Sequence, residues 1–170
     1  KVMKEHDVPD WYLWSCKKIK YMFPKAHAVA YVMMGIRIAW FKIHEPLAYY
    51  AAFFTIRATA FDYGLMCQGK AAIDNHIKAY KANPNLSKKE QDTLRDMRIV
   101  QEMYARGIEF LPIDLYKAKA NRFQIIDGKL MPALNCIEGM GDKAAEAVVD
   151  AAKQGKFLSK DDFRDRTKVS

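Results

Sequence analysis

The sequence has few cysteines, and neither they nor the histidines are spaced as metal ligands. Cys16, Cys67 and Cys136 are odd in number and far apart, and the four histidines are dispersed. No Cys-x-x-Cys or His-x-x-x-His pair occurs, so we do not expect a zinc site. The same cysteine usage does not fit a disulfide-stapled domain. It indicates reduced thiols in a cytosolic compartment.

Long apolar runs are also lacking. No run reaches the roughly 18 residues that a membrane-spanning helix needs, and the most apolar stretch is interrupted by His27, Arg37 and Lys42. No signal peptide is recognisable, and the chain begins at Lys1 without Met. We therefore expect a piece excised from a longer protein, located in the cytoplasm and without a membrane partner.

Several catalytic signatures are missing. The sequence has no Walker loop, dinucleotide fingerprint or nucleophile elbow. Two-metal phosphoryl or nucleotidyl transfer needs a cluster of carboxylates that holds Mg²⁺. Asp7 and Asp10 are close in sequence, but nothing marks them as such a cluster. We expect no catalytic residue and no metal-holding cofactor site in this chain.

What is present is a basic sequence with enough apolar residues for a core. The 170 residues are 51% hydrophobic and 12% aromatic, which excludes a disordered tail and allows one domain or two small ones. The net charge is +8, and residues 1–60 hold nine Lys and Arg against four Asp and Glu. This excess fits a phosphate-rich partner, although many solvated proteins share it.

The central stretch predicts a helix from Pro24 to about His44. Proline is favoured at the first helical position, and Pro46 would stop the helix. An apolar stripe at intervals of four and three predicts one buried face; its members are Met22, Ala26, Val29, Met33, Ile36, Trp40 and Ile43.

Lysines gather where this helix starts. Lys25 is in the first turn, and Lys17, Lys18 and Lys20 come just before it. Free N–H groups with several lysines can hold an anion, most simply phosphate. The alternative is a solvated basic turn at the end of a helix that follows Pro9, where lysines suit the helix dipole.

Further helices are expected after Pro46, where aromatic residues indicate core, and over residues 71–81. Ser87 and Glu90 form a capping box that predicts a helix to Arg106, with Gly107 as the residue after it. Asp127-Gly128 predicts a two-residue turn in a β-hairpin. We therefore predict a mainly α fold, divided into a helical subdomain 1–107, a β-hairpin connector 108–132 and a module 133–170.

The last module fits a helix–hairpin–helix motif over residues 134–149. Gly139 and Gly141 permit a tight turn, and Ala145 is small where paired helices would pack. The helix that opens after the turn presents free N–H groups that can hold a DNA phosphate without reading sequence. Glu138 and Asp142 are unfavourable there unless they point away. A purely structural helical hairpin, or one that binds protein, stays open.

Three stretches carry a wider resemblance. Residues 15–31 read SCKKIKYMFPKAHAVAY, and residues 37–44 and 46–54 read RIAWFKIH and PLAYYAAFF. They closely resemble the fingers of the PolC-type DNA polymerase III alpha subunit, a bacterial family C replicative polymerase. The resemblance covers essentially all 170 residues and implies the fingers and the first helix–hairpin–helix, with a second one beginning near Ser159.

The resemblance implies the partners and the site residues. The partners would be primer–template DNA, the incoming dNTP, the rest of the polymerase chain and the replisome. Mg²⁺ would be held by palm aspartates outside this stretch, so the chain alone should be inactive. The implied nucleotide-side candidates are Lys17, Lys18, Lys20, Lys25, His27, Tyr31 and Arg37. The DNA-side candidates are Gly139, Met140, Gly141, Lys143 and Ala144, with a monovalent cation on the carbonyls of Asn135, Ile137 and Met140.

Two other functions remain open from the sequence alone. A non-enzymatic DNA-binding or scaffold module could carry the same hairpin and basic charge. A helical protein-interaction module would show no salt-dependent DNA binding.

Overall fold

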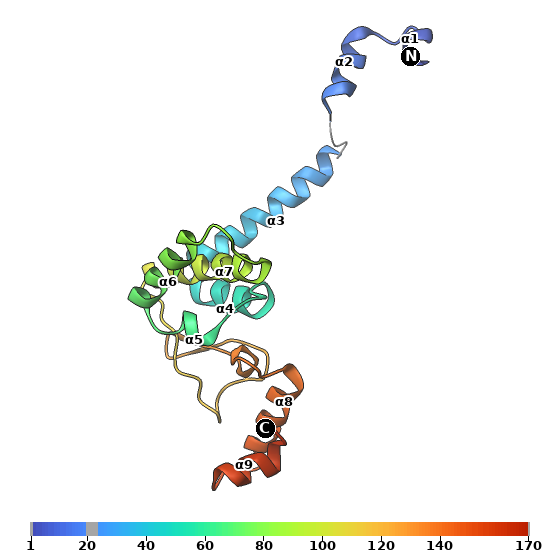
Figure 1. Ribbon diagram of the computed structural model, residues 1–170. Helices are drawn as coiled ribbons and strands as arrows, with labels where there is room; N and C mark the ends of the chain where they lie inside the picture. The colour runs from blue at the N-terminus through green and yellow to red at the C-terminus, as the bar shows by residue number, and fades with distance from the viewer. Residues whose placement is uncertain (1, 20–23, 170) are drawn as a thin grey trace. The chain divides into compact units, whose positions relative to one another are not determined.

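A computed structural model describes residues 2–19 and 24–169 of the chain. They divide into two compact units, Lys1–Trp40 and Phe41–Ser170. The predicted fold class, mainly helical with one small β-hairpin, is confirmed. The elements, of which Figure 1 labels the α-helices, are α1 (Val2–Glu5), α2 (Asp10–Lys18), α3 (Lys25–His44), α4 (Pro46–Ile56), α5 (Tyr63–Met66), α6 (Lys70–Ala82), α7 (Lys88–Ala105), β1 (Gln124–Ile126), β2 (Lys129–Met131), the 3₁₀ turn η1 (Leu134–Cys136), α8 (Asp142–Lys153) and α9 (Lys160–Thr167).

The first unit holds α1, α2 and most of α3. Helix α2 follows Pro9 and ends with Lys17 and Lys18 in its last turn, as predicted. Helix α3 begins at Lys25, one residue after the predicted start, and the Pro24 carbonyl accepts the Ala28 N–H at 3.2 Å. Proline therefore stands at the helix boundary, where its missing N–H leaves no donor unsatisfied.

The prediction that the apolar stripe of α3 is buried is wrong for the chain described here. No residue of α3 is buried, and the exposed fraction of the side chain is 47% for Val29 and 67% for Ile43. Met22 lies outside the described residues. A period of three and four identifies side chains that share a helix face. It does not supply the surface that covers them.

The second unit is organised around aromatic side chains of α4. Tyr50 and Phe54 are buried, which confirms that this aromatic stretch is core, although Ile56 at the helix end is exposed. Phe54 lies in a cluster with three phenylalanines from later segments, and the ring centroids are 5.1 to 6.2 Å apart. These are ordinary edge and tilted aromatic contacts; the partners are Phe61, Phe110 and Phe123.

Helices α6 and α7 pack against each other and against this core (Figure 1). The predicted capping box opens α7: the Ser87 hydroxyl accepts the Glu90 N–H at 3.3 Å, and the Glu90 carboxylate accepts the Ser87 N–H at 2.7 Å. Gly107 follows the helix with a φ of 77°, as expected of the residue after a helix C-terminus.

The predicted hairpin is formed by β1 and β2, which pair antiparallel with Ile125 opposite Leu130. Asp127 and Gly128 both have positive φ, 50° and 74°, as a two-residue turn of this kind requires. Phe123 and Leu130 belong to the same core as α4 and α7, so the hairpin is packed onto the helices. The division of the chain at 107 and 132 stays a prediction.

A second, smaller core lies under α8. Ala145 and Val148 are fully buried there with Leu134 and Met131, and Phe163 of α9 packs against them. Helix α8 therefore presents one apolar stripe inward and leaves its first turn and its charged side chains outside. Within the described residues, no helix combines the length and the hydropathy that crossing a bilayer requires.

Candidate nucleic-acid interface

The loop between η1 and α8 has the geometry that the two glycines predicted. Gly139 has a φ of 80°, a conformation that is accessible to glycine at little cost. The Met140 N–H donates to the Ile137 carbonyl at 3.0 Å, which closes the turn. The chain then passes through Gly141 into α8, with Gly141 as the residue before the helix.

The first turn of α8 offers unpaired donors. Gly141 supplies no side-chain cap, and the first N–H of the helix to bond within it is that of Ala145, which donates to the Gly141 carbonyl at 3.0 Å. The N–H groups of Asp142, Lys143 and Ala144 have no acceptor within the helix. These donors, with the positive end of the helix dipole, suit an anion.

The carboxylate of Asp142 is engaged elsewhere. Its Oδ1 accepts a hydrogen bond from Asn135 Nδ2 at 2.9 Å. This bond ties η1 to the start of α8 and gives the acidic group a partner of its own. The bond directs this carboxylate toward Asn135.

A hollow of about 530 Å³ lies beside the turn. We call it the hairpin hollow. It brings together four of the predicted DNA-side residues, Gly139, Met140, Lys143 and Ala144, and it also contains the exposed Glu138. The fifth, Gly141, lies at the start of α8 between Met140 and Lys143.

Lys168 lines the hairpin hollow and was missed from the sequence. It follows α9, has a φ of 58°, and comes close to the turn because α9 packs on α8. No sequence signal indicated this, because the residue is 25 positions from Lys143 and only the fold joins them. The hollow thus holds two lysines and one glutamate.

The predicted cation site on backbone carbonyls stays a prediction. Of its three members, Ile137 already accepts the Met140 N–H. The other two are Asn135 and Met140.

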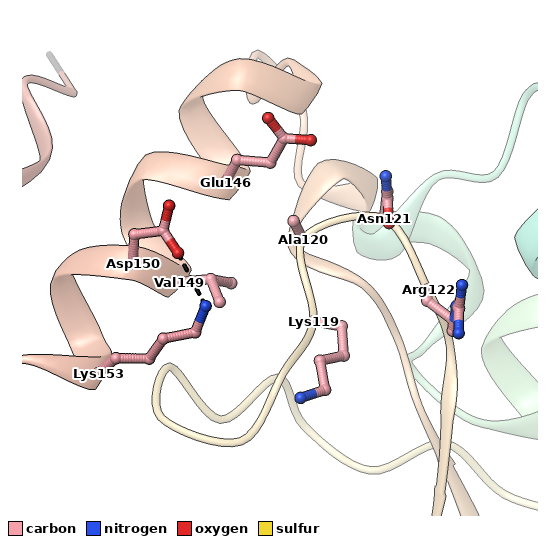
Figure 2. A pocket seen from close by; sticks show the side chains of 8 residues that line it. All are labelled: Lys119, Ala120, Asn121, Arg122, Glu146, Val149, Asp150 and Lys153. Atoms are coloured by element: carbon pink, nitrogen blue, oxygen red, sulfur yellow. Dashed lines mark hydrogen bonds and ion pairs between the residues drawn. The ribbon is translucent and has the colours of Figure 1, made fainter.

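A second hollow, of about 340 Å³, lies on the neighbouring flank of α8, between this helix and residues 119–122. We call it the connector hollow (Figure 2). Its charged residues are Lys119, Arg122, Glu146, Asp150 and Lys153. The Lys153 ammonium and the Asp150 carboxylate form an ion pair at 2.8 Å, drawn in Figure 2.

The nucleotide-side candidates that the structure describes are exposed. Lys17, Lys25 and Arg37 lie on the surface of the first unit. The Lys18 ammonium lies over the Trp14 ring, 4.2 Å from its centroid, which is a cation–π contact. Lys20 lies outside the described residues.

His27 and Tyr31 form a pair one turn apart on α3. Their ring centroids are 4.5 Å apart and their planes are inclined by 64°. Tyr31 is 68% exposed, so this pair is presented outward. The structure thus places the candidates of α3 on the surface and leaves their contacts with a nucleotide as predictions.

The cysteine side chains are half-buried. All three cysteines are free thiols, and burial raises the pKa of Cys136 to about 11 and also raises that of Cys67. Thiols with raised pKa values are poor nucleophiles. Across residues 2–19 and 24–169, no three His, Cys, Asp or Glu side chains come together as a metal site.

The amino-acid sequence of the chain is similar to those of known proteins. Residues 107–170 match the family described as "Helix-hairpin-helix motif". The chain is 49% identical over 170 residues to a DNA polymerase III PolC-type from Clostridium perfringens (strain 13 / Type A). It is 49% identical over 169 residues to that of Caldanaerobacter subterraneus subsp. tengcongensis, and 49% identical over 173 residues to that of Bacillus subtilis (strain 168).

These matches cover 99% of this chain but 12% of each relative. The chain therefore spans about an eighth of the length of the curated relatives that it matches. The identity extends across both units and across the helix–hairpin–helix module. Over nearly its whole length the chain is therefore similar to one stretch of PolC-type DNA polymerase III, and its residues 107–170 carry the helix–hairpin–helix match.

Proposed function

We propose that this chain is the part of a replicative DNA-directed DNA polymerase that faces the incoming nucleotide and holds the DNA backbone. The observation that carries the proposal is the 49% identity to PolC-type DNA polymerase III along 99% of the chain. Residues 1–107 act as fingers over the dNTP and the templating base. Residues 133–170 bind duplex DNA.

The hairpin binds a phosphate of the DNA backbone. The unpaired N–H groups at the start of α8 are donors, and Lys143 and Lys168 add positive charge in the hairpin hollow. Backbone donors and lysines recognise phosphate rather than base edges. Binding is therefore independent of DNA sequence and falls with salt, because it releases counterions.

The start of α3 faces the triphosphate of the dNTP. Lys25 stands in the first turn, where N–H groups lack acceptors within the helix. A cation at this end disfavours a helix slightly, and a bound triphosphate offsets that cost. The exposed apolar side chains of α3 pack against another part of the polymerase.

The Mg²⁺ ions of nucleotidyl transfer are held by carboxylates elsewhere in the polymerase. The described residues contain no suitable cluster of ligands, so we assign no chemical step to them. The partners are primer–template DNA, the dNTP, the rest of the polymerase chain and the replisome, in the bacterial cytoplasm.

The DNA-binding part can be tested with the 170-residue chain. Fluorescence anisotropy with two labelled duplexes of unrelated sequence, over a series of salt concentrations, should give equal affinities and a steep fall with salt. The probe is Lys143→Ala, with Lys78→Ala on α6 as a matched surface control. Affinity that ignores salt, or that is confined to one sequence, would contradict the proposal.

A further inference from the structure

The connector hollow is a further concave surface in the C-terminal part of the chain where basic side chains gather. Lys119 and Arg122 come from the connector, and Lys153 comes from α8 (Figure 2). We propose that this hollow binds a second backbone phosphate of the same DNA duplex. The proposal rests on the proposed function of the hairpin.

The connector presents its basic side chains from a fixed backbone. The carbonyls of Lys119 and Ala120 accept the N–H groups of Leu134 and Asn135, each at 2.9 Å. On one side of this segment Ala118 is buried in the second core, and on the other Phe123 is buried in the first. Because both ends of the segment are held, the backbone of the intervening residues is already ordered. Little further backbone conformational entropy is lost when their side chains bind a ligand.

The charges of the hollow leave two cations without an internal partner. Lys153 is paired with Asp150 at 2.8 Å. Among the eight side chains drawn in Figure 2 this is the one ion pair, and Lys119 and Arg122 are exposed with no carboxylate partner in the described chain. Glu146 provides one opposing negative charge.

The available side-chain groups favour a phosphate. A lysine ammonium and an arginine guanidinium are donors without acceptors, and the Asn121 amide adds two further N–H donors. Arginine in particular matches phosphate oxygens with a pair of parallel N–H groups. The apolar lining is limited to Ala120 and Val149, so the hollow does not suit a hydrophobic ligand.

Position along α8 connects this hollow to the hairpin. Lys143, Ala144 and Ala147 line the hairpin hollow, whereas Glu146, Val149, Asp150 and Lys153 line the connector hollow. The two sets are centred about five residues apart, which is about 7 Å along a helix. One DNA strand carries a phosphate about every 3.4 Å of duplex axis. A single duplex crossing α8 can therefore reach both hollows.

The test measures duplex binding by the 170-residue chain with both connector cations removed. Lys119→Ala with Arg122→Ala should weaken binding by about tenfold and reduce the steepness of the salt dependence by about 0.9 in log–log units, the value for one phosphate. The matched control is Lys78→Ala with Lys81→Ala, which removes two exposed cations from α6. Thermal unfolding of both doubles checks that the chain still folds.

Two further variants separate the possible failures. Glu146→Gln should tighten binding, and Lys143→Ala should weaken it through the hairpin. Wild-type chain that does not bind duplex DNA would overturn the proposed function itself. If the wild type binds and Lys143→Ala weakens it, but the connector double behaves like the α6 double, the connector hollow is not a phosphate site.

Discussion

The ammonium of Lys42, at the end of α3, lies 2.8 Å from each carboxylate oxygen of Glu102 in α7. Arg106 adds a second cation to the same carboxylate at 3.2 Å and donates to the Lys42 carbonyl at 3.1 Å. Partial burial alone would raise the pKa of Glu102, but the hydrogen bond and charge of Lys42, with Arg106, hold that pKa below its usual range. This cluster fixes the last turn of α3 on the helical core.

We expect Glu102→Gln to lower the free energy of unfolding by about 1 kcal/mol, since the pair is partly exposed. A carboxyl whose folded pKa is depressed stabilises the protein above its unfolded pKa of about 4.3. That contribution is lost as the pH falls through the folded pKa. Urea unfolding from neutral to acidic pH should show this loss in the wild type and not in the variant. The control is Glu109→Gln, whose partner Lys129 is exposed. Equal effects of the two changes would contradict a special role of the cluster.

Asp96 of α7 is fully buried, and its Oδ2 accepts the Ala60 N–H at 3.0 Å. Asp96→Ala should lower the free energy of unfolding by about 1–3 kcal/mol, because the partly buried Ala60 N–H loses its acceptor. Asp96→Asn keeps an acceptor and should lower the free energy of unfolding by less. A result in which both variants unfold at the wild-type denaturant midpoint would rule out this structural role.

The same residue gives a pH dependence of opposite sign. Burial raises the pKa of Asp96 above its ordinary value, against the opposing hydrogen bond from Ala60 and the charge of Arg95. Folding therefore favours the protonated form, and this contribution is present below the unfolded pKa of about 3.9 and lost as the pH rises through the folded pKa. As the pH rises through the folded pKa of Asp96, the free energy of unfolding of the wild type should therefore fall relative to that of Asp96→Asn. Urea unfolding of both proteins over this pH range measures the difference.

In the hairpin hollow, two charges of opposite sign should have opposite effects on DNA binding. Lys168→Asn removes a cation but tolerates the left-handed backbone conformation, and it should weaken duplex binding. Glu138→Gln removes an acid and should tighten it. Lys168→Arg, which keeps the charge, is the control and should bind as the wild type does. Anisotropy titrations in which both neutral variants move affinity in the same direction would argue against electrostatic contact at this hollow.

The 170-residue chain alone should not extend a primer. Positioning of DNA and nucleotide leaves the barrier to phosphoryl transfer largely intact without metal ions at the reacting oxygens. Primer extension with Mg²⁺ and all four dNTPs checks this, with a full-length PolC-type polymerase as positive control. Extension above background that follows the pure chain through purification would show that catalytic carboxylates lie within it.

Local signals predicted much of this structure. Ser87 with Glu90, Asp127-Gly128 and Gly139 each determine their own turn or cap through backbone geometry, and none depends on distant residues. The prediction that the apolar stripe of α3 is buried failed, because periodicity does not reveal what covers a helix face. Lys168, Lys119 and Arg122 were missed because they reach their hollows through tertiary packing. Of the candidate site, only the hairpin was predictable, since its glycines and donors are contiguous in sequence.

In the function that we propose, one part of the chain serves the nucleotide and another serves the DNA. It is tested most directly by Lys25→Ala and Lys143→Ala in the full-length polymerase, with kinetics measured against dNTP and against primer–template in turn. Lys25→Ala should lower kcat/KM for dNTP about tenfold to a hundredfold, as loss of a charge-assisted contact implies, and leave DNA affinity unchanged. Lys143→Ala should weaken primer–template binding and leave saturation by dNTP unchanged. Wild-type kcat/KM for dNTP in Lys25→Ala, or identical defects in the two variants, would contradict the account.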